Sequence, residues 1–145
     1  PSRSRLGAGK VSAVRRDIQK GFPQHEASIW ERLVRQAVPR SSLADTEWST
    51  AARWWGPGSD RKPMEIDLLA ESDDGKSLLI GEVKRRVTGA ELHRLGTELE
   101  RKIDRLPLVN QYTTVHPYIF ALSVCGERSQ NVPAVAASDL LPYLT

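Results

Sequence analysis

The feature that most constrains this 145-residue chain is a pair of β-strand patterns joined by a tight turn. Residues 64–70 (MEIDLLA) and 77–84 (SLLIGEVK) are rich in apolar side chains, and each has the length of a typical strand. The Asp-Asp-Gly sequence at residues 73–75 is typical of a turn. We therefore predict an antiparallel hairpin in the middle of the chain, against which the remaining elements pack.

Charged residues interrupt both strands of this predicted hairpin. Asp67 lies within the first strand, and Glu82 and Lys84 end the second. Because side chains alternate along a strand, Glu82 and Lys84 share one face with the apolar Leu78 and Ile80. Two carboxylates and an ammonium beside an apolar run are costly to bury unless they bind something. A divalent cation and a phosphodiester would satisfy all three.

The acid-x-Lys spacing is weak evidence by itself, because it occurs four times in the chain. Only Glu82-Val83-Lys84 ends an apolar strand whose hairpin partner carries another acid. Two other copies lie in turn-like segments and one on a charged helical pattern, where solvent exposure is the simpler interpretation. These three are Asp60-x-Lys62, Asp74-x-Lys76 and Glu100-x-Lys102.

Composition predicts an ordinary globular protein of one domain, with 39% hydrophobic and 27% charged residues. No apolar stretch approaches the ~20 residues of a membrane helix, so we expect no membrane partner. A single cysteine excludes an internal disulfide framework, and no signal peptide is visible, so we expect a cytoplasmic location. Cys125 is interpreted as a small buried hydrophobe, and the three histidines lack zinc-ligand spacing.

Positive charge is concentrated at the N-terminus. Residues 1–20 carry six basic side chains against one acidic, whereas the whole chain has a net charge of +3. Such a segment either contacts phosphates or forms a solvated linker, and the sequence leaves both open. We therefore predict a basic N-terminal arm or linker over residues 1–21 and a domain over residues 22–145. Because the chain begins at Pro1, we expect a processed protein or one domain of a longer one.

Hydrophobic periodicity predicts the other elements. Their order, α-β-β-β-α-β with a short β-α tail, implies an α/β fold with a mixed central sheet flanked by helices. The Trp-Trp-Gly-Pro-Gly sequence at residues 54–58 is interpreted as a loop. The predicted helices are 24–38, 88–106 and 139–144 with Ser138 as N-cap, plus a short helical pattern at 11–20, and the remaining strands are 43–53, 118–124 and 132–136.

The arrangement resembles the PD-(D/E)xK nuclease superfamily, which includes restriction endonucleases and archaeal Holliday-junction resolvases. Ala52-Arg53-Trp54-Trp55-Gly56, Glu65-Ile66-Asp67 and Gly81-Glu82-Val83-Lys84 are similar to the nuclease-like C-terminal domain of prokaryotic, notably archaeal, AAA-type ATPases, a domain long catalogued as of unknown function. Trp30-Glu31 matches a Phe-Glu in that family's first helix. The resemblance spans about residues 22–124 and implies a restriction-endonuclease-like αβββαβ core and a nuclease-like domain over residues 22–145. Ile66 replaces the Pro that often precedes the motif Asp.

The resemblance also implies roles for individual residues. Asp67, Glu82, the Val83 carbonyl and Glu31 would bind Mg²⁺ or Mn²⁺, and Lys84 would orient the attacking water or neutralise charge on phosphorus. The implied activity is metal-dependent endonucleolytic hydrolysis of DNA. Implied partners are DNA, an ATPase domain in the same or another chain, and a second copy of the chain. There is no Walker A loop, so an ATPase part would lie outside this sequence.

Several alternatives stay open at this level. The acids and Lys84 would also be satisfied by an internal ion-pair network, and the fold would then be a catalytically silent module that binds nucleic acid or docks a protein. Glu65 is interpreted either as a second acid or as a solvated strand end. The tryptophans would stack on splayed bases or pack in the core. Candidate nucleic-acid contacts are Arg53, Trp54, Trp55, Arg85 and Arg86.

Overall fold

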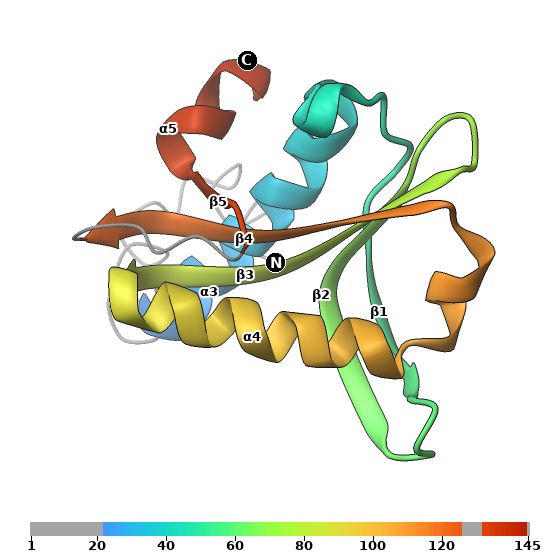
Figure 1. The fold of residues 1–145 in the computed structure, drawn as a ribbon. Helices are drawn as coiled ribbons and strands as arrows, with labels where there is room; N and C mark the ends of the chain where they lie inside the picture. The colour runs from blue at the N-terminus through green and yellow to red at the C-terminus, as the bar shows by residue number, and fades with distance from the viewer. Residues whose placement is uncertain (1–21, 126–131, 145) are drawn as a thin grey trace, which may run out of the picture.

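The computed structural model describes residues 22–125 and 132–144, with side chains from residue 28 onward, and is built on a five-stranded sheet in the order β1-β2-β3-β4-β5 (Figure 1). The β1–β2 and β2–β3 pairs are antiparallel, whereas the β3–β4 and β4–β5 pairs are parallel. This mixed sheet confirms the predicted α/β class and the α-β-β-β-α-β order, which is consistent with a restriction-endonuclease-like core. The strands are β1 Ala52–Pro57, β2 Pro63–Glu71, β3 Ser77–Thr88, β4 Thr114–Cys125 and β5 Ala134–Ala136.

Helices α3 (Phe22–Ala37) and α4 (Gly89–Arg105) cover opposite faces of the sheet. The first core, on the α3 side, contains Trp30 and Val34 packed with Phe120 of β4. The second core, on the α4 side, contains the apolar stripe of that helix, formed by Leu92, Leu95 and Leu99 and continued by Leu106. The short segments between and after these elements are η1 Val38–Arg40, η2 Leu43–Asp45, η3 Pro107–Gln111, α5 Ala137–Leu140 and η4 Leu141–Tyr143.

Helix α4 follows β3 directly and connects it to the parallel strand β4. Thr88 caps the helix, because its hydroxyl oxygen accepts a hydrogen bond from the Glu91 N–H at 3.2 Å. Pro107 follows the last turn and prevents its continuation. The long pairing of β3 with β4 extends from Ser77–Thr114 to Thr88–Cys125, so it supports β3 along its whole length.

Four local predictions are wrong. Residues 54–58 were expected to form a loop, but residues 54–57 belong to β1, which includes both tryptophans. The strand predicted for residues 43–53 is also wrong, because η2 occupies its start and β1 begins only at Ala52. Ser138 lies inside α5, and it is the Ala136 N–H that is capped, by Asp139 Oδ2 at 2.9 Å. Cys125 is exposed rather than buried. The short helix predicted for 11–20 lies outside the described residues.

Strand β2 leaves β3 halfway along its length. The two strands pair from Glu71–Leu78 to Leu68–Gly81, and the first half of β2 pairs only with β1 (Figure 1). The β1–β2 register also shifts, from Ala52–Leu69 to Trp54–Ile66, so β2 carries one extra residue as a bulge beside Asp67. Residues 53–66 therefore form a two-stranded hairpin that projects from the sheet, called here the hairpin arm.

Gly81 allows β3 to pass closely beneath an aromatic ring just before Glu82. A Cβ atom at this position would lie 2.6 Å from Cε2 of Phe120, a fully buried side chain of the first core. The ring cannot move away without displacing its neighbours, because protein interiors are close-packed. The absence of a side chain at Gly81 is therefore a packing requirement.

We predict that Gly81→Ala lowers the free energy of unfolding by about 1–3 kcal/mol, because the added methyl group overpacks the core. Urea unfolding followed by circular dichroism measures the loss. Phe120→Leu removes part of the ring, so Gly81→Ala should cost less in that background, and the double-mutant cycle reports the coupling. Equal costs in both backgrounds would show that the Phe120 contact is not the cause.

Candidate active site

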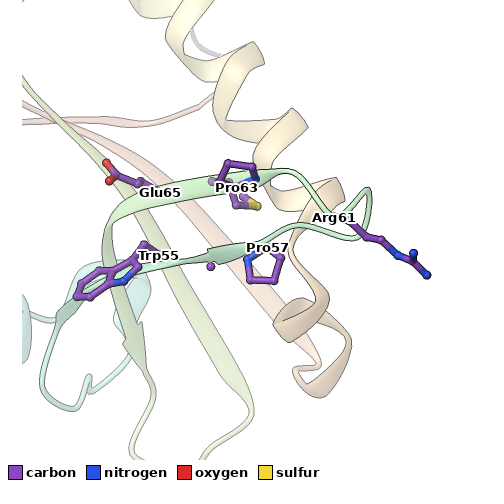
Figure 2. Close-up of a pocket in the computed structure, with 7 residues that line it drawn as sticks. Trp55, Pro57, Arg61, Pro63 and Glu65 are labelled. Carbon is purple, nitrogen blue, oxygen red and sulfur yellow. The ribbon is translucent and has the colours of Figure 1, made fainter.

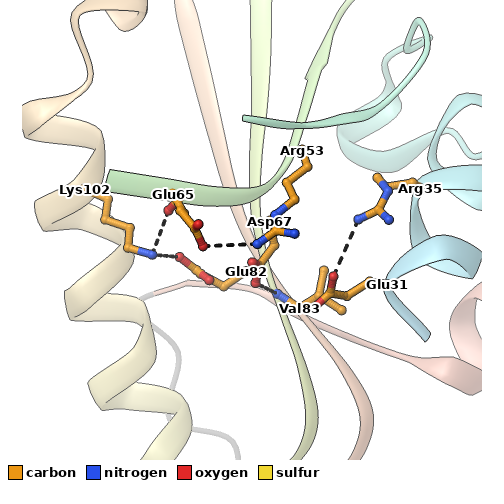
Figure 3. A network of polar contacts seen from close by, with 8 residues as sticks. All are labelled: Glu31, Arg35, Arg53, Glu65, Asp67, Glu82, Val83 and Lys102. Atoms are coloured by element: carbon orange, nitrogen blue, oxygen red, sulfur yellow. Dashed lines mark hydrogen bonds and ion pairs between the residues drawn. The ribbon is translucent and has the colours of Figure 1, made fainter. Parts of the chain in front are cut away.

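Asp67 and Glu82 meet at the point where β2 separates from β3. Continuing the pairing register by one step beyond Leu68–Gly81 places Asp67 opposite Glu82. The Val83 N–H donates a hydrogen bond to Asp67 Oδ2 at 2.9 Å, in place of a bond between the two backbones (Figure 3). Two strands thus present their carboxyl groups to one place, as expected for the hairpin.

The environment of Glu82 disfavours its charge. Its residue is only 6% exposed. Burial first, and then hydrogen bonding and repulsion from the neighbouring Asp67 carboxyl group, raise the pKa of Glu82 to about 7, and the ammonium of Lys102 opposes this rise. Near neutral pH, the pair therefore holds either a shared proton or a bound cation more favourably than two free charges.

Lys102 of α4 supplies the positive charge that Glu82 contacts. Its Nζ donates to Glu82 Oε1 and, at 3.0 Å, to the Glu65 carbonyl oxygen (Figure 3). Lys102 was not predicted as a site residue, because the Glu100-x-Lys102 triplet was expected on a solvated helix face. A signal was present, because Lys102 lies three residues after Leu99 and four before Leu106, within the apolar stripe.

Lys84 does not form the ion pair with Glu82 or Asp67 that the alternative interpretation of an internal ion-pair network required. Its side chain is exposed and has no ion-pair partner among the described residues, so Glu82 pairs with Lys102 instead. Its backbone carbonyl accepts a hydrogen bond from Trp30 Nε1 at 2.9 Å. This bond fixes the middle of α3 against β3. The Lys84 ammonium takes no part in it and is available to a ligand.

Glu31 lies on the α3 side, in an ion pair with Arg35 at 3.7 Å (Figure 3). Across residues 22–125 and 132–144, no group of three or more His, Cys, Asp or Glu side chains converges in a way that would hold a metal ion. The structure thus brings Asp67 and Glu82 together and does not add Glu31 to them. The supporting role of Glu31 stays a prediction.

The chemistry of the donors suits a hard cation. Asp67, Glu82 and the Val83 carbonyl offer only oxygen, and Mg²⁺ is commonly held by one or two carboxylates, with water and substrate phosphate completing its shell. Asp67 Oδ2 and Glu82 Oε1 are already engaged, by the Val83 N–H and by Lys102, so one oxygen of each carboxylate has no other described donor. The residues present therefore fit a magnesium or manganese ion.

The candidate nucleic-acid residues fall into separate environments. Arg53 binds Glu65 at 3.1 Å, and both side chains are largely exposed, so Glu65 behaves as a solvated strand end. Trp54 packs against the second core, whereas Trp55 is 69% exposed. Arg85 is half-buried and Arg86 is exposed, and both lie in β3 shortly after Glu82.

Fold and site together define an α/β protein with a restriction-endonuclease-like order of elements and an acidic pair where two strands diverge. The chain belongs to the DUF234 family, described as archaeal and bacterial proteins of unknown function, whose model matches residues 1–95. Comparison with curated proteins and with solved structures finds no significant match. No helix among the described residues is long and apolar enough to cross a membrane.

We predict that the Glu82 carboxyl group titrates near pH 7 in metal-free protein, as its pKa of about 7 requires. Asp67→Asn should lower this pKa by removing a negative neighbour, and Lys102→Met should raise it by removing the ammonium. Carbon-13 NMR of labelled glutamate carboxyl groups measures both shifts. Glu65→Gln, which alters an exposed acid, serves as control, and an ordinary glutamate pKa for Glu82 would contradict the prediction.

Proposed function

We propose that this chain is a PD-(D/E)xK-type nuclease module that hydrolyses DNA phosphodiester bonds with Mg²⁺ or Mn²⁺. The observation that supports it best is the meeting of the Asp67 and Glu82 carboxyl groups where β2 and β3 diverge, with Lys84 two residues further along β3. A buried acid costs stability, so the convergence of the half-buried Asp67 with the buried Glu82 favours a binding role over a purely structural one.

Each residue of the proposed site has a separate role. Asp67, Glu82 and the Val83 carbonyl hold the cation, which when bound polarises the phosphate and lowers the pKa of water. Lys84, exposed and without an ion pair among the described residues, contacts the phosphate or the water beside it and offsets negative charge. The Trp30–Lys84 hydrogen bond holds the backbone of that lysine in place.

A second candidate function, binding or docking without catalysis, is supported by a different observation. Lys102 already neutralises Glu82, and an acidic pair compensated in this way suits a nuclease-like fold that only binds nucleic acid or docks a protein. In either case the proposed context is a larger assembly with an ATPase domain in the same chain or another, and a dimer that reaches both DNA strands. The first function requires catalytic turnover, whereas the second does not.

We predict that the protein nicks plasmid DNA in the presence of Mn²⁺ or Mg²⁺, and that Glu82→Gln, Asp67→Asn and Lys84→Met each reduce the rate by about 100-fold or more. Isothermal titration should show Mn²⁺ binding on the order of 1 mM or tighter. Glu82→Gln should abolish this binding, whereas Lys84→Met should keep it. Lys76→Met, at an exposed lysine in the β2–β3 turn, is the matched control.

Metal binding without cleavage by the wild-type chain would favour the docking or binding module. Absence of metal binding would overturn both the cation site and the hydrolytic proposal. Unchanged cleavage in Glu82→Gln would show that a contaminating nuclease or another site is responsible.

We further predict that Lys102→Met strengthens Mn²⁺ binding by about tenfold, because it removes a positive charge that competes for Glu82. Titration calorimetry compares the variant with the wild type, with Lys76→Met again as control. Weaker binding in Lys102→Met would instead assign Lys102 to holding Glu82 in the orientation that the ion requires.

A further inference from the structure

One face of the hairpin arm is covered by neither helix. Trp55 pairs directly with Glu65, and Pro57 with Pro63, so these four side chains share a face. The alternate residues of the arm pack into the second core, on the α4 side. No residue of the arm belongs to the first core, on the α3 side.

Trp55 dominates this open face. Its residue is 69% exposed, whereas Trp30 and Trp48 are each 3% exposed and Trp54 packs against the second core. Beside it lies a hollow of about 540 Å³ that Pro57, Pro63 and Met64 help to line (Figure 2). A large exposed apolar surface in a groove with polar edges is typical of a binding site.

The surrounding charge is positive once ion pairs are taken into account. Asp60 is held by Arg105 at 2.9 Å, and Glu65 by Arg53 at 3.1 Å. Arg61 and Lys62, at the tip of the arm, are exposed and have no ion-pair partner within the described part of the chain. Arg61 also has a φ of 66°, a left-handed conformation that disfavours a long side chain.

We propose that the open face of the arm binds single-stranded DNA, with an unpaired base stacked on the Trp55 indole and the flanking phosphates at Arg61 and Lys62. An exposed tryptophan gives a stacking surface that any base can use, and nearby cations follow the backbone. In a duplex the base faces are already stacked, so this surface distinguishes unpaired from paired DNA. The proposal rests on the proposed function only in taking DNA as the ligand.

The position of the arm relates this surface to the acidic pair. Glu65, which pairs with Trp55, precedes Asp67 by two residues on β2, and its carbonyl oxygen accepts from the lysine that contacts Glu82. A strand held at Trp55 therefore lies along the same hairpin as the proposed cation site. A protein partner would use the apolar face without needing the two cations, so the free positive charge favours DNA.

The test is fluorescence anisotropy with a labelled oligonucleotide of about 12 nucleotides and with the matching duplex, in EDTA so that no cleavage occurs. We expect Trp55→Ala to weaken single-strand binding about tenfold or more, and Trp55→Phe to weaken it less. Duplex binding should change by less than about twofold, because it depends on phosphate contacts. Tyr143→Ala removes another exposed aromatic side chain, 38% exposed, as a matched control.

A second readout uses intrinsic fluorescence. Stacking of a base should quench the emission of the exposed Trp55, so added single strands quench the wild type and fail to quench Trp55→Phe. Arg61→Ala combined with Lys62→Ala should weaken both forms of DNA and reduce the salt dependence of binding.

The proposal is overturned if the wild type binds no single strand, or if Trp55→Ala leaves binding unchanged or weakens both forms equally. Unchanged binding would show that the strand does not stack on Trp55 and that DNA is not the ligand of this face. Plasmid cleavage without single-strand binding would overturn this proposal alone. Trp55-dependent single-strand binding without cleavage would overturn only the hydrolytic function.

Discussion

The separation of β2 from β3 at Asp67 is the constraint on which the site and the hairpin arm both depend. The backbone pairing of β2 with β3 ends at Leu68–Gly81. Beyond it, the Val83 N–H donates its hydrogen bond to the Asp67 side chain instead of to the backbone of a neighbouring strand. An unpaired buried N–H costs about 1–3 kcal/mol, so this bond stabilises the divergence. The opening it leaves is where Glu82 lies, and the part of β2 released from β3 forms the arm with β1.

The burial of Glu82 lowers the stability of this arrangement. A carboxylate that is almost fully buried beside another acid loses much of its hydration, and Lys102 returns only part of that loss. Replacing a buried ion pair with apolar residues of similar volume often leaves stability unchanged or improves it. The charges at this position are therefore poorly explained by stability alone, which is why a ligand is the more economical explanation.

Periodicity predicted the elements that bury one continuous face. The hairpin of residues 64–84 and helix α4 were visible because their apolar side chains recur at the strand and helix spacings. The loop predicted at residues 54–58 was wrong because Gly56 and Pro57 are ordinary turn formers, whereas here they lie on an edge strand where proline is tolerated. The sequence could not separate Trp54 from Trp55, because only the register of β1 on β2 decides which of them faces α4.

The residues of the candidate site also differ in how far the sequence predicts them. Asp67 and Glu82 come from adjacent strands of one hairpin, so local reasoning was enough to bring them together. Lys102 reaches Glu82 from helix α4, so its contact depends on how the helix packs on the sheet, and its place in the apolar stripe of α4 was the signal for it. It also links the acidic pair to the hairpin arm, since its ammonium donates both to Glu82 and to the backbone of the arm at Glu65. A displacement of the arm that moves the Glu65 carbonyl must therefore change the hydrogen bonds of the Lys102 ammonium. The position of that positive charge relative to the Glu82 carboxyl group then changes as well.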